Sequence, residues 1–162
     1  MGSIRLMRGK LHQVRVTQRR REYVGSIAVD VDLLDQVGML PLEEVEVVNI
    51  DNGQRWSTYL LPAERGSREV CPNGGGALLC EPGHRLIIFC YELKALAELR
   101  EAPHRARVLV LGEGNSSVSL FEQTLEPRGA GLVYSTRAIS GELPQQPDIL
   151  LGPQTFEGLG AR

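Results

Sequence analysis

The stretch EVEVVNIDNGQRWSTYLL, residues 44–61, decides the fold class. Two runs rich in β-branched and aromatic residues, 44–50 and 55–61, flank the tripeptide Asp51-Asn52-Gly53. An Asn-Gly pair between two such runs is a strong signal for a β-hairpin, because both residues tolerate the positive φ angles of a tight turn. The stretch therefore predicts two antiparallel strands joined by a short turn.

Three further segments have strand patterns, namely residues 10–17, 84–93 and 107–112. The first, KLHQVRVT, alternates, which predicts one face that carries His12, Val14 and Val16. The second, HRLIIFCYEL, is almost continuously apolar, as expected for a strand that is covered on both faces. The chain is therefore predicted to consist mainly of short strands.

Helices are predicted to be few and short. Asp30 is placed to cap a helix over residues 31–37, and Gly38 is placed to end it. Residues 92–101, ELKALAELRE, have the spacing of a second amphipathic helix that stops before Pro103. A strand-rich chain with two short helices favours a small β-barrel, so the predicted fold class is mainly β.

The composition changes near residue 117. Residues 118–162 hold four of the nine prolines and six of the eighteen glycines. The sequence therefore predicts one domain over residues 1–117 and a Pro/Gly-rich C-terminal extension over 118–162 that is partly disordered. The segments SLFEQTL and GLVYST are the parts of that extension able to dock on the barrel.

The composition also excludes several classes of protein. The chain has 162 residues, of which 42% are apolar and 23% charged, and its net charge is −2. These values exclude a mostly disordered chain, and no apolar run approaches the roughly 20 residues of a membrane span. No general basic excess points to a nucleic-acid partner. Three cysteines without a signal-like N-terminus are typical of reduced thiols, so we expect a cytoplasmic protein.

Two candidate functional patterns can be assessed from the residues alone. Cys71, Cys80 and Cys90, with His84, lack the close cysteine pair of a zinc site, so no metal is expected. The glycine run that follows Asn73 is either a plain turn or a row of backbone N–H donors able to hold a carboxylate. The residues alone leave both interpretations open.

Five longer motifs carry a more specific signal. They are Lys10-Leu11-His12, Tyr23-x-Gly25-Ser26, Arg55-Trp56-Ser57-Thr58-Tyr59, Ala63-Glu64-Arg65-Gly66-Ser67-Arg68 and Asn73-Gly74. With these motifs in this order and spacing, the chain resembles the aspartate 1-decarboxylase family from about Ile4 to Asn115. The resemblance implies a double-psi β-barrel and a homotetramer.

The resemblance also implies a reaction. Members of the family are made as a proenzyme that cuts itself between the residues matching Gly25 and Ser26, and the serine becomes a pyruvoyl group. That group replaces pyridoxal phosphate (PLP) and any metal, and forms a Schiff base with L-aspartate. The products are β-alanine, used for pantothenate biosynthesis, and CO2. The sequence leaves open whether cleavage is spontaneous or needs a maturation partner.

Individual roles follow from the same resemblance. Self-cleavage is assigned to Gly25, Ser26, Thr58 and Asn73, with Thr58 as the donor to the oxyanion and Asn73 in support. Tyr59 is the proton donor in the decarboxylation. Substrate binding is assigned to Lys10, Arg55, Thr58, Gly74, Gly75 and Gly76. His12 and Tyr23 are supporting residues.

Two other functions stay in view. One is an uncleaved, non-enzymatic β-barrel that serves as a binding module. The other is a pyruvoyl decarboxylase for a different acidic amino acid, because glutamate exceeds aspartate by only one methylene. The family commonly has alanine at the positions of Gly75 and Gly76, so this chain departs from the pattern in its glycine loop.

Overall fold

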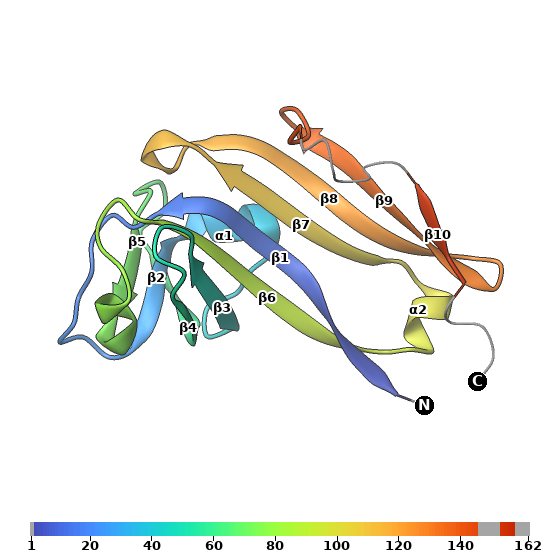
Figure 1. Ribbon diagram of the computed structural model, residues 1–162, viewed down its shortest axis with the longest axis horizontal. Helices are drawn as coiled ribbons and strands as arrows, with labels where there is room; N and C mark the ends of the chain where they lie inside the picture. The colour runs from blue at the N-terminus through green and yellow to red at the C-terminus, as the bar shows by residue number, and fades with distance from the viewer. Residues whose placement is uncertain (1, 146–152, 158–162) are drawn as a thin grey trace.

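The computed structural model describes residues 2–145 and 153–157, and strands make up most of it (Figure 1). The strands are β1 (Ser3–Arg15), β2 (Ser26–Asp30), β3 (Glu44–Asn49), β4 (Arg55–Ala63), β5 (Val70–Asn73), β6 (Arg85–Ala95), β7 (His104–Leu111), β8 (Ser117–Arg128), β9 (Gly131–Ser140) and β10 (Gln154–Phe156). The α-helices are α1 (Val31–Val37) and α2 (Glu98–Glu101), and two 3-10 helices, η1 (Gly74–Leu78) and η2 (Glu113–Asn115), complete the described elements. The prediction of a mainly β fold is confirmed.

All ten strands belong to one sheet, in the order β10-β9-β8-β7-β1-β6-β3-β4-β2-β5. Most neighbours are antiparallel, but β1 with β7 and β2 with β4 are parallel. Within the described residues β5 and β10 stand at opposite edges, so the hydrogen-bonded ladder is open where a closed barrel was expected. The short strands β2 to β5 gather at one end of the molecule, and the long strands run side by side away from them (Figure 1).

The core lies between the curled sheet and α1. Its fully buried side chains come from β1 to β7 and α1, and they include Leu11, Ile27, Leu60, Ile88 and Leu109. On β6 the buried residues alternate with half-buried ones, so only one face of this strand is fully covered. The expectation that both faces of β6 are covered is therefore wrong for the single chain.

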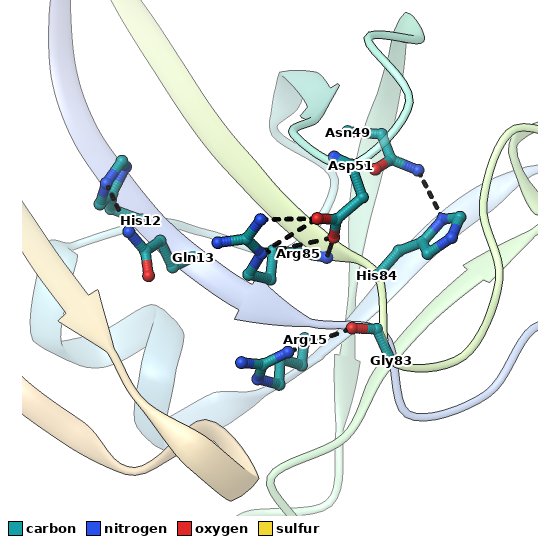
Figure 2. A network of polar contacts seen from close by, with 8 residues as sticks. All are labelled: His12, Gln13, Arg15, Asn49, Asp51, Gly83, His84 and Arg85. Atoms are coloured by element: carbon teal, nitrogen blue, oxygen red, sulfur yellow. Dashed lines mark hydrogen bonds and ion pairs between the residues drawn. The ribbon is translucent and has the colours of Figure 1, made fainter.

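The predicted hairpin is confirmed as β3 and β4, which pair antiparallel around a turn where Gly53 has a φ of +75°. Asp51 in this turn holds the start of β6, because the Arg85 backbone N–H donates to its Oδ2 (2.6 Å) and the Arg85 guanidinium to its Oδ1 (2.6 Å) (Figure 2). These bonds lower the pKa of Asp51 to about 2. The turn is thus tied to the strand that pairs with β3.

The alternation predicted for residues 10–17 fails at one position. The register of β1 against β6 shifts between His12 and Val14, and Gln13 has a φ of +63°. This bulge buries Leu11 and Val14 on the core side and leaves His12 on the opposite face. The prediction that His12 shares the face of Val14 is therefore wrong.

The two helix predictions have different outcomes. The first is confirmed, since the Asp30 side chain accepts a hydrogen bond from the Asp32 N–H (2.8 Å) and Gly38 ends α1 with a φ of +70°. The second is wrong over most of its length. The first half of the predicted helix continues β6 and pairs with the start of β1, as in Leu93 with Arg5. Tertiary pairing has overridden helix propensity there, and α2 has only four residues.

Asp30 is also the basis of a stability prediction. Its buried carboxylate accepts three backbone hydrogen bonds, from Asp32 (2.8 Å), Gly66 (3.0 Å) and Arg68 (2.7 Å). Asp30→Ala should lower the free energy of unfolding by about 3 kcal/mol, because three backbone N–H groups lose one buried, charged acceptor. Urea unfolding measures this. The exposed Asp35→Ala on the same helix is the control, and an equal effect of the two would contradict the account.

The predicted extension begins at residue 118, the second residue of β8. β8 pairs with β7 along its length, β9 pairs with β8, and β10 pairs with β9, so the described part of residues 118–162 continues the sheet. The other residues of the predicted tail, 146–152 and 158–162, lie outside the described residues. No helix in the described part of the chain is long and apolar enough to cross a membrane.

Candidate active site

Ser26 begins β2 and is 1% exposed, although Gly25 before it is exposed. The Ser26 hydroxyl donates to the Val24 carbonyl oxygen (3.3 Å) and accepts from Nδ2 of Asn73 (2.9 Å). Asn73 is the last residue of β5 and pairs directly with Ser26. The antiparallel register thus brings a hydroxyl and an amide donor together from positions 47 residues apart.

Tyr59 reaches the same row of the sheet from the other side. β2 and β4 run parallel with Ile27 opposite Leu60, so one residue back along both strands puts Ser26 level with Tyr59. Residues level on neighbouring strands point to the same face and lie about 4.8 Å apart in the backbone. Tyr59, Ser26 and Asn73 therefore form one row across β4, β2 and β5, on the face opposite the core residue Ile27.

Gly74 packs against Gly25, directly before the Gly25-Ser26 bond. A Cβ atom at Gly74 would lie 2.8 Å from Gly25 Cα and 3.2 Å from the Tyr23 carbonyl oxygen, and Gly74 has a φ of +61°. The Gly74 N–H donates to the Arg20 carbonyl (2.9 Å), which ties the loop before Gly25 to η1. Gly25 itself has no positive φ, so the backbone freedom in this contact belongs to Gly74.

A substitution at Gly74 tests this contact. Gly74→Ala should displace Gly25, and a strain of 1–3 kcal/mol at the site would slow any reaction of the Gly25-Ser26 peptide by about tenfold or more. The fraction of uncut chain at fixed times, resolved by denaturing electrophoresis, measures the rate. Gly75→Ala is the matched control, since a Cβ there meets nothing within 4 Å. Equal processing of the two variants would contradict the role given to this contact.

Packing against Trp56 explains why position 76 is a glycine, where the family commonly has alanine. A Cβ at this position would lie 2.7 Å from Nε1 of Trp56, which occupies the space an alanine side chain would fill. The run itself forms η1, and its first N–H is already bonded to Arg20. Of the predicted carboxylate donors, Gly74 is therefore engaged in this structure.

Arg55 and Thr58 take opposite faces of β4. Arg55 lies on the face of Tyr59, four residues before it, and its side chain is exposed with Glu46 Oε2 at 3.9 Å. A long, exposed ion pair of this kind leaves a guanidinium free to bind an incoming carboxylate. Thr58 is half-buried on the core-side face of β4, together with Leu60. Two residues back along the parallel pairing of Ile27 with Leu60, Thr58 is level with Gly25. Arg55 and Thr58 therefore lie on the strand of Tyr59, with Arg55 on the face of Tyr59 and Ser26 and Thr58 on the other face.

The structure does not bring Lys10 and His12 to Ser26. Along the sheet, Lys10 is opposite Phe89, Phe89 is opposite Glu46, and Glu46 is opposite Ser57. Three strand spacings, about 14 Å, therefore separate Lys10 from β4. Lys10 and His12 line a pocket with residues of β7, β8 and β9 instead.

Burial lowers the pKa of Lys10, and burial together with the charge of Lys10 lowers the pKa of His12. The His12 ring lies beside the Gln13 amide, 3.5 Å from its nitrogen (Figure 2). Tyr23 is 49% exposed, and its carbonyl oxygen is the part of it near Gly74. Within the described ranges no group of His, Cys, Asp and Glu is arranged to hold a metal ion.

Sequence reasoning missed Cys71. This residue is fully buried on β5, opposite Ala28, and its Sγ donates to Oδ1 of Asn73 (3.4 Å). The alternation of a strand, which places Cys71 and Asn73 on one face, could have indicated the contact. All three cysteines are free thiols.

Comparison with known proteins gives a consistent result. A family model described as aspartate decarboxylase matches residues 2–118. A protein of Gloeothece citriformis named aspartate 1-decarboxylase is 55% identical over 153 residues, which cover 93% of this chain and 98% of that protein. One of the same name from Synechocystis sp. is 51% identical over 144 residues, 89% of this chain and 99% of its own. One from Bacillus subtilis is 46% identical over 110 residues, 68% of this chain and 85% of its own.

Proposed function

The chain belongs to the aspartate decarboxylase family, and we propose that it converts L-aspartate to β-alanine and CO2 with a pyruvoyl group made from its own Ser26. The observation that carries the proposal is the buried Ser26 hydroxyl, bonded to Asn73 beside the Gly25 peptide and level with Tyr59. This proposal also takes residues 1–117 as the catalytic domain, residues 118–162 as its extension and the cytoplasm as its location.

Self-cleavage starts at the Ser26 hydroxyl. Its oxygen attacks the Gly25 carbonyl carbon, and the Gly25–Ser26 amide becomes an ester as the nitrogen leaves. The negative charge on the Gly25 oxygen needs a donor, and Thr58, at the level of Gly25, is assigned to it. Asn73 Nδ2 holds the attacking oxygen in place through its 2.9 Å bond. β-Elimination then breaks the ester, which frees residues 1–25 with a C-terminal carboxylate and leaves a dehydroalanine at position 26. Water hydrolyses that group with release of ammonia, so residues 26–162 begin with a pyruvoyl group.

The residues around Ser26 fit a pyruvoyl group. The position is buried, has a side-chain amide donor, and follows Gly25, against which Gly74 packs without a Cβ. Once formed, this group supplies a ketone that condenses with the substrate amine and accepts the electrons of the bond to the departing carboxylate. No metal and no pyridoxal phosphate is needed for that chemistry.

Arg55 holds the carboxylate that the substrate keeps. Its planar guanidinium can bind that group through two hydrogen bonds. Neither Arg55 nor Lys10 should bind the departing carboxylate, because such a bond would stabilise the ground state. Tyr59 then donates its hydroxyl proton to the carbon that loses CO2. Its place level with Ser26 puts that hydroxyl on the face where the substrate carbon would lie.

A second copy of the chain is part of the proposal. Lys10 lies at least three strands from the row of Ser26 within one chain, so Lys10 acts on the substrate of a neighbouring copy. The outer face of β6 is half-exposed and carries Ile87, Phe89 and Tyr91, which favours association through this face. These observations favour association of copies, and with the assembly that the family resemblance implies we propose a homotetramer of cleaved chains. Whether a maturation partner speeds cleavage is tested by comparing chain made in a purified translation system with chain made in cells.

A direct substrate comparison tests the function. Purified chain should release β-alanine from L-aspartate, and turnover of L-glutamate should be at least about tenfold slower, because one extra methylene costs 1–3 kcal/mol in a fitted pocket. Amino-acid analysis of the reaction measures both. Equal turnover would mean a decarboxylase of acidic amino acids in general. A cleaved chain that acts on neither would contradict the proposal and favour a binding module.

A further inference from the structure

The hairpin of β8 and β9 almost wholly follows the residues that the family model matches, 2–118. It joins the sheet through β7, which lies beside β1, the strand of Lys10 (Figure 1). The pocket at Lys10, with a volume of about 200 Å³, has Lys10 and His12 on one side. Phe121 and Gln123 of β8 and Thr136 of β9 line its other side. The extension therefore turns the surface around Lys10 into a pocket.

Lys10 is a cation without a counter-ion in this pocket. Its side chain is half-buried, and within the described residues it makes no ion pair and no side-chain hydrogen bond. No aspartate or glutamate lines the pocket in that part of the chain. The Nδ1 atom of His12 is buried there without a hydrogen-bond partner. An ammonium and an unpartnered ring nitrogen in a partly dry pocket favour a small anion.

Gln123 is held ready for such a ligand. Its Nε2 donates to the Tyr134 hydroxyl (2.9 Å), and the Thr136 hydroxyl donates to the same oxygen (3.1 Å). One N–H of the Gln123 amide is left for a ligand, in an orientation that these bonds fix. Phe121 adds an apolar wall that strengthens polar contacts inside by excluding water.

The family resemblance already assigns Lys10 to substrate binding; we propose that the β8–β9 hairpin forms the facing wall of its pocket, and that Gln123 on this wall is a specificity-determining residue for the carboxylate that the substrate keeps. The proposal rests on the proposed function in one respect, since it takes the natural ligand to be the substrate held by Ser26 of a neighbouring copy. The pocket itself needs neither cleavage nor turnover.

The experiment uses the full chain with Ser26→Ala, which cannot form the pyruvoyl group. Calorimetry with succinate, a dicarboxylate without an amine, should show saturable binding, and the neutral succinamide should not bind. Lys10→Met in this background should weaken succinate binding by about tenfold or more, the loss of a charge-assisted bond. Gln123→Leu should weaken it by about fivefold, and Ser135→Ala, the neighbour of Thr136 on β9, should leave it unchanged.

Three results would overturn the proposal. Succinate could fail to bind, could bind equally well after Lys10→Met, or could be indifferent to Gln123→Leu. The first result would arise if a side chain of a second copy fills the pocket. Turnover of aspartate by the unmodified chain is measured separately, so loss of the pocket and loss of the proposed function are distinguishable.

A second inference concerns self-cleavage and rests on different contacts. The Cys71 thiol donates to Oδ1 of Asn73 (3.4 Å), and Asn73 Nδ2 donates to Ser26 Oγ (2.9 Å). All three side chains are buried. The Asn73 amide could rotate by 180°, which would point its oxygen at Ser26 in place of its N–H group. The Cys71 thiol opposes this rotation because it donates to the amide oxygen. We infer that Cys71 is a positioning residue that keeps the Asn73 donor toward Ser26.

Three variants test this role of Cys71 by the rate of self-cleavage and the melting temperature. Cys71→Ala should slow cleavage by about fivefold, the loss of one weak hydrogen bond. Cys71→Ser keeps a donor and should restore most of the rate. Cys90→Ala removes another buried thiol, bonded to the Gly9 carbonyl, and should not slow cleavage whatever it does to the melting temperature. Unslowed cleavage in Cys71→Ala, or cleavage in Cys71→Ser as slow as in Cys71→Ala, would overturn the inference.

Discussion

Replacing Ser26 by alanine is expected to leave a single uncut chain of 17.8 kDa with no decarboxylase activity. The reason is that Ser26 supplies both the oxygen that attacks the Gly25 carbonyl and the carbon atoms that become the pyruvoyl group. Alanine fills the buried position with almost no change of shape, so the fold should persist. Denaturing electrophoresis measures the cleavage, and β-alanine formation measures the activity.

The chain contains a matched control for this variant. Gly66-Ser67 is the same dipeptide in an exposed turn, where the Ser67 hydroxyl accepts a hydrogen bond from the backbone N–H of Glu69 (3.2 Å). Ser67→Ala should be cut and active at the normal rate. A cut or active Ser26→Ala variant would contradict the origin of the cofactor, whereas an effect of both variants would indicate a general loss of folding.

Replacing Tyr59 by phenylalanine is expected to separate maturation from catalysis. The variant keeps the ring on β4 and loses only the hydroxyl, which acts after the pyruvoyl group has formed. Cleavage should therefore proceed normally, while kcat falls by about 10²- to 10⁴-fold, the usual contribution of a general acid. Mass spectrometry measures the first property and steady-state kinetics the second.

Tyr91→Phe is the control for the loss of a phenolic hydroxyl. Tyr91 lies on the outer face of β6, where its ring is at 87° to that of Phe89, and the variant keeps this ring, so association through the face is preserved. It should change neither cleavage nor kcat. Full activity of Tyr59→Phe would remove the proton-donor role, and failure of that variant to cleave would place Tyr59 in maturation instead.

Local signals predicted most of the fold. The hairpin around Gly53, the capped helix after Asp30 and the strand over 107–112 each depend on neighbours in sequence, and each is present. Residues 92–95 failed because their fate depends on pairing with the N-terminal residues of β1. The bulge at Gln13 has no local signal either, since glutamine does not favour a positive φ.

The candidate site was predictable only as a set of residue types. The motif around Gly25-Ser26 indicated the cleaved bond, but the partners of Ser26 come from β4 and β5, whose register no local pattern fixes. The same reason explains why Lys10 was expected beside Ser26 and is found in a pocket of the extension. The distance of Lys10 from Ser26 depends on the strand order, and its contact with a neighbouring copy depends on the assembly; no local sequence pattern encodes either of them.

The intact mass of the purified protein under denaturing conditions tests the central claim most directly. The account predicts two chains that divide between Gly25 and Ser26, the larger of them lighter by one ammonia than a chain with N-terminal serine. A single species of 17.8 kDa that persists after exposure to a cell extract would contradict the account.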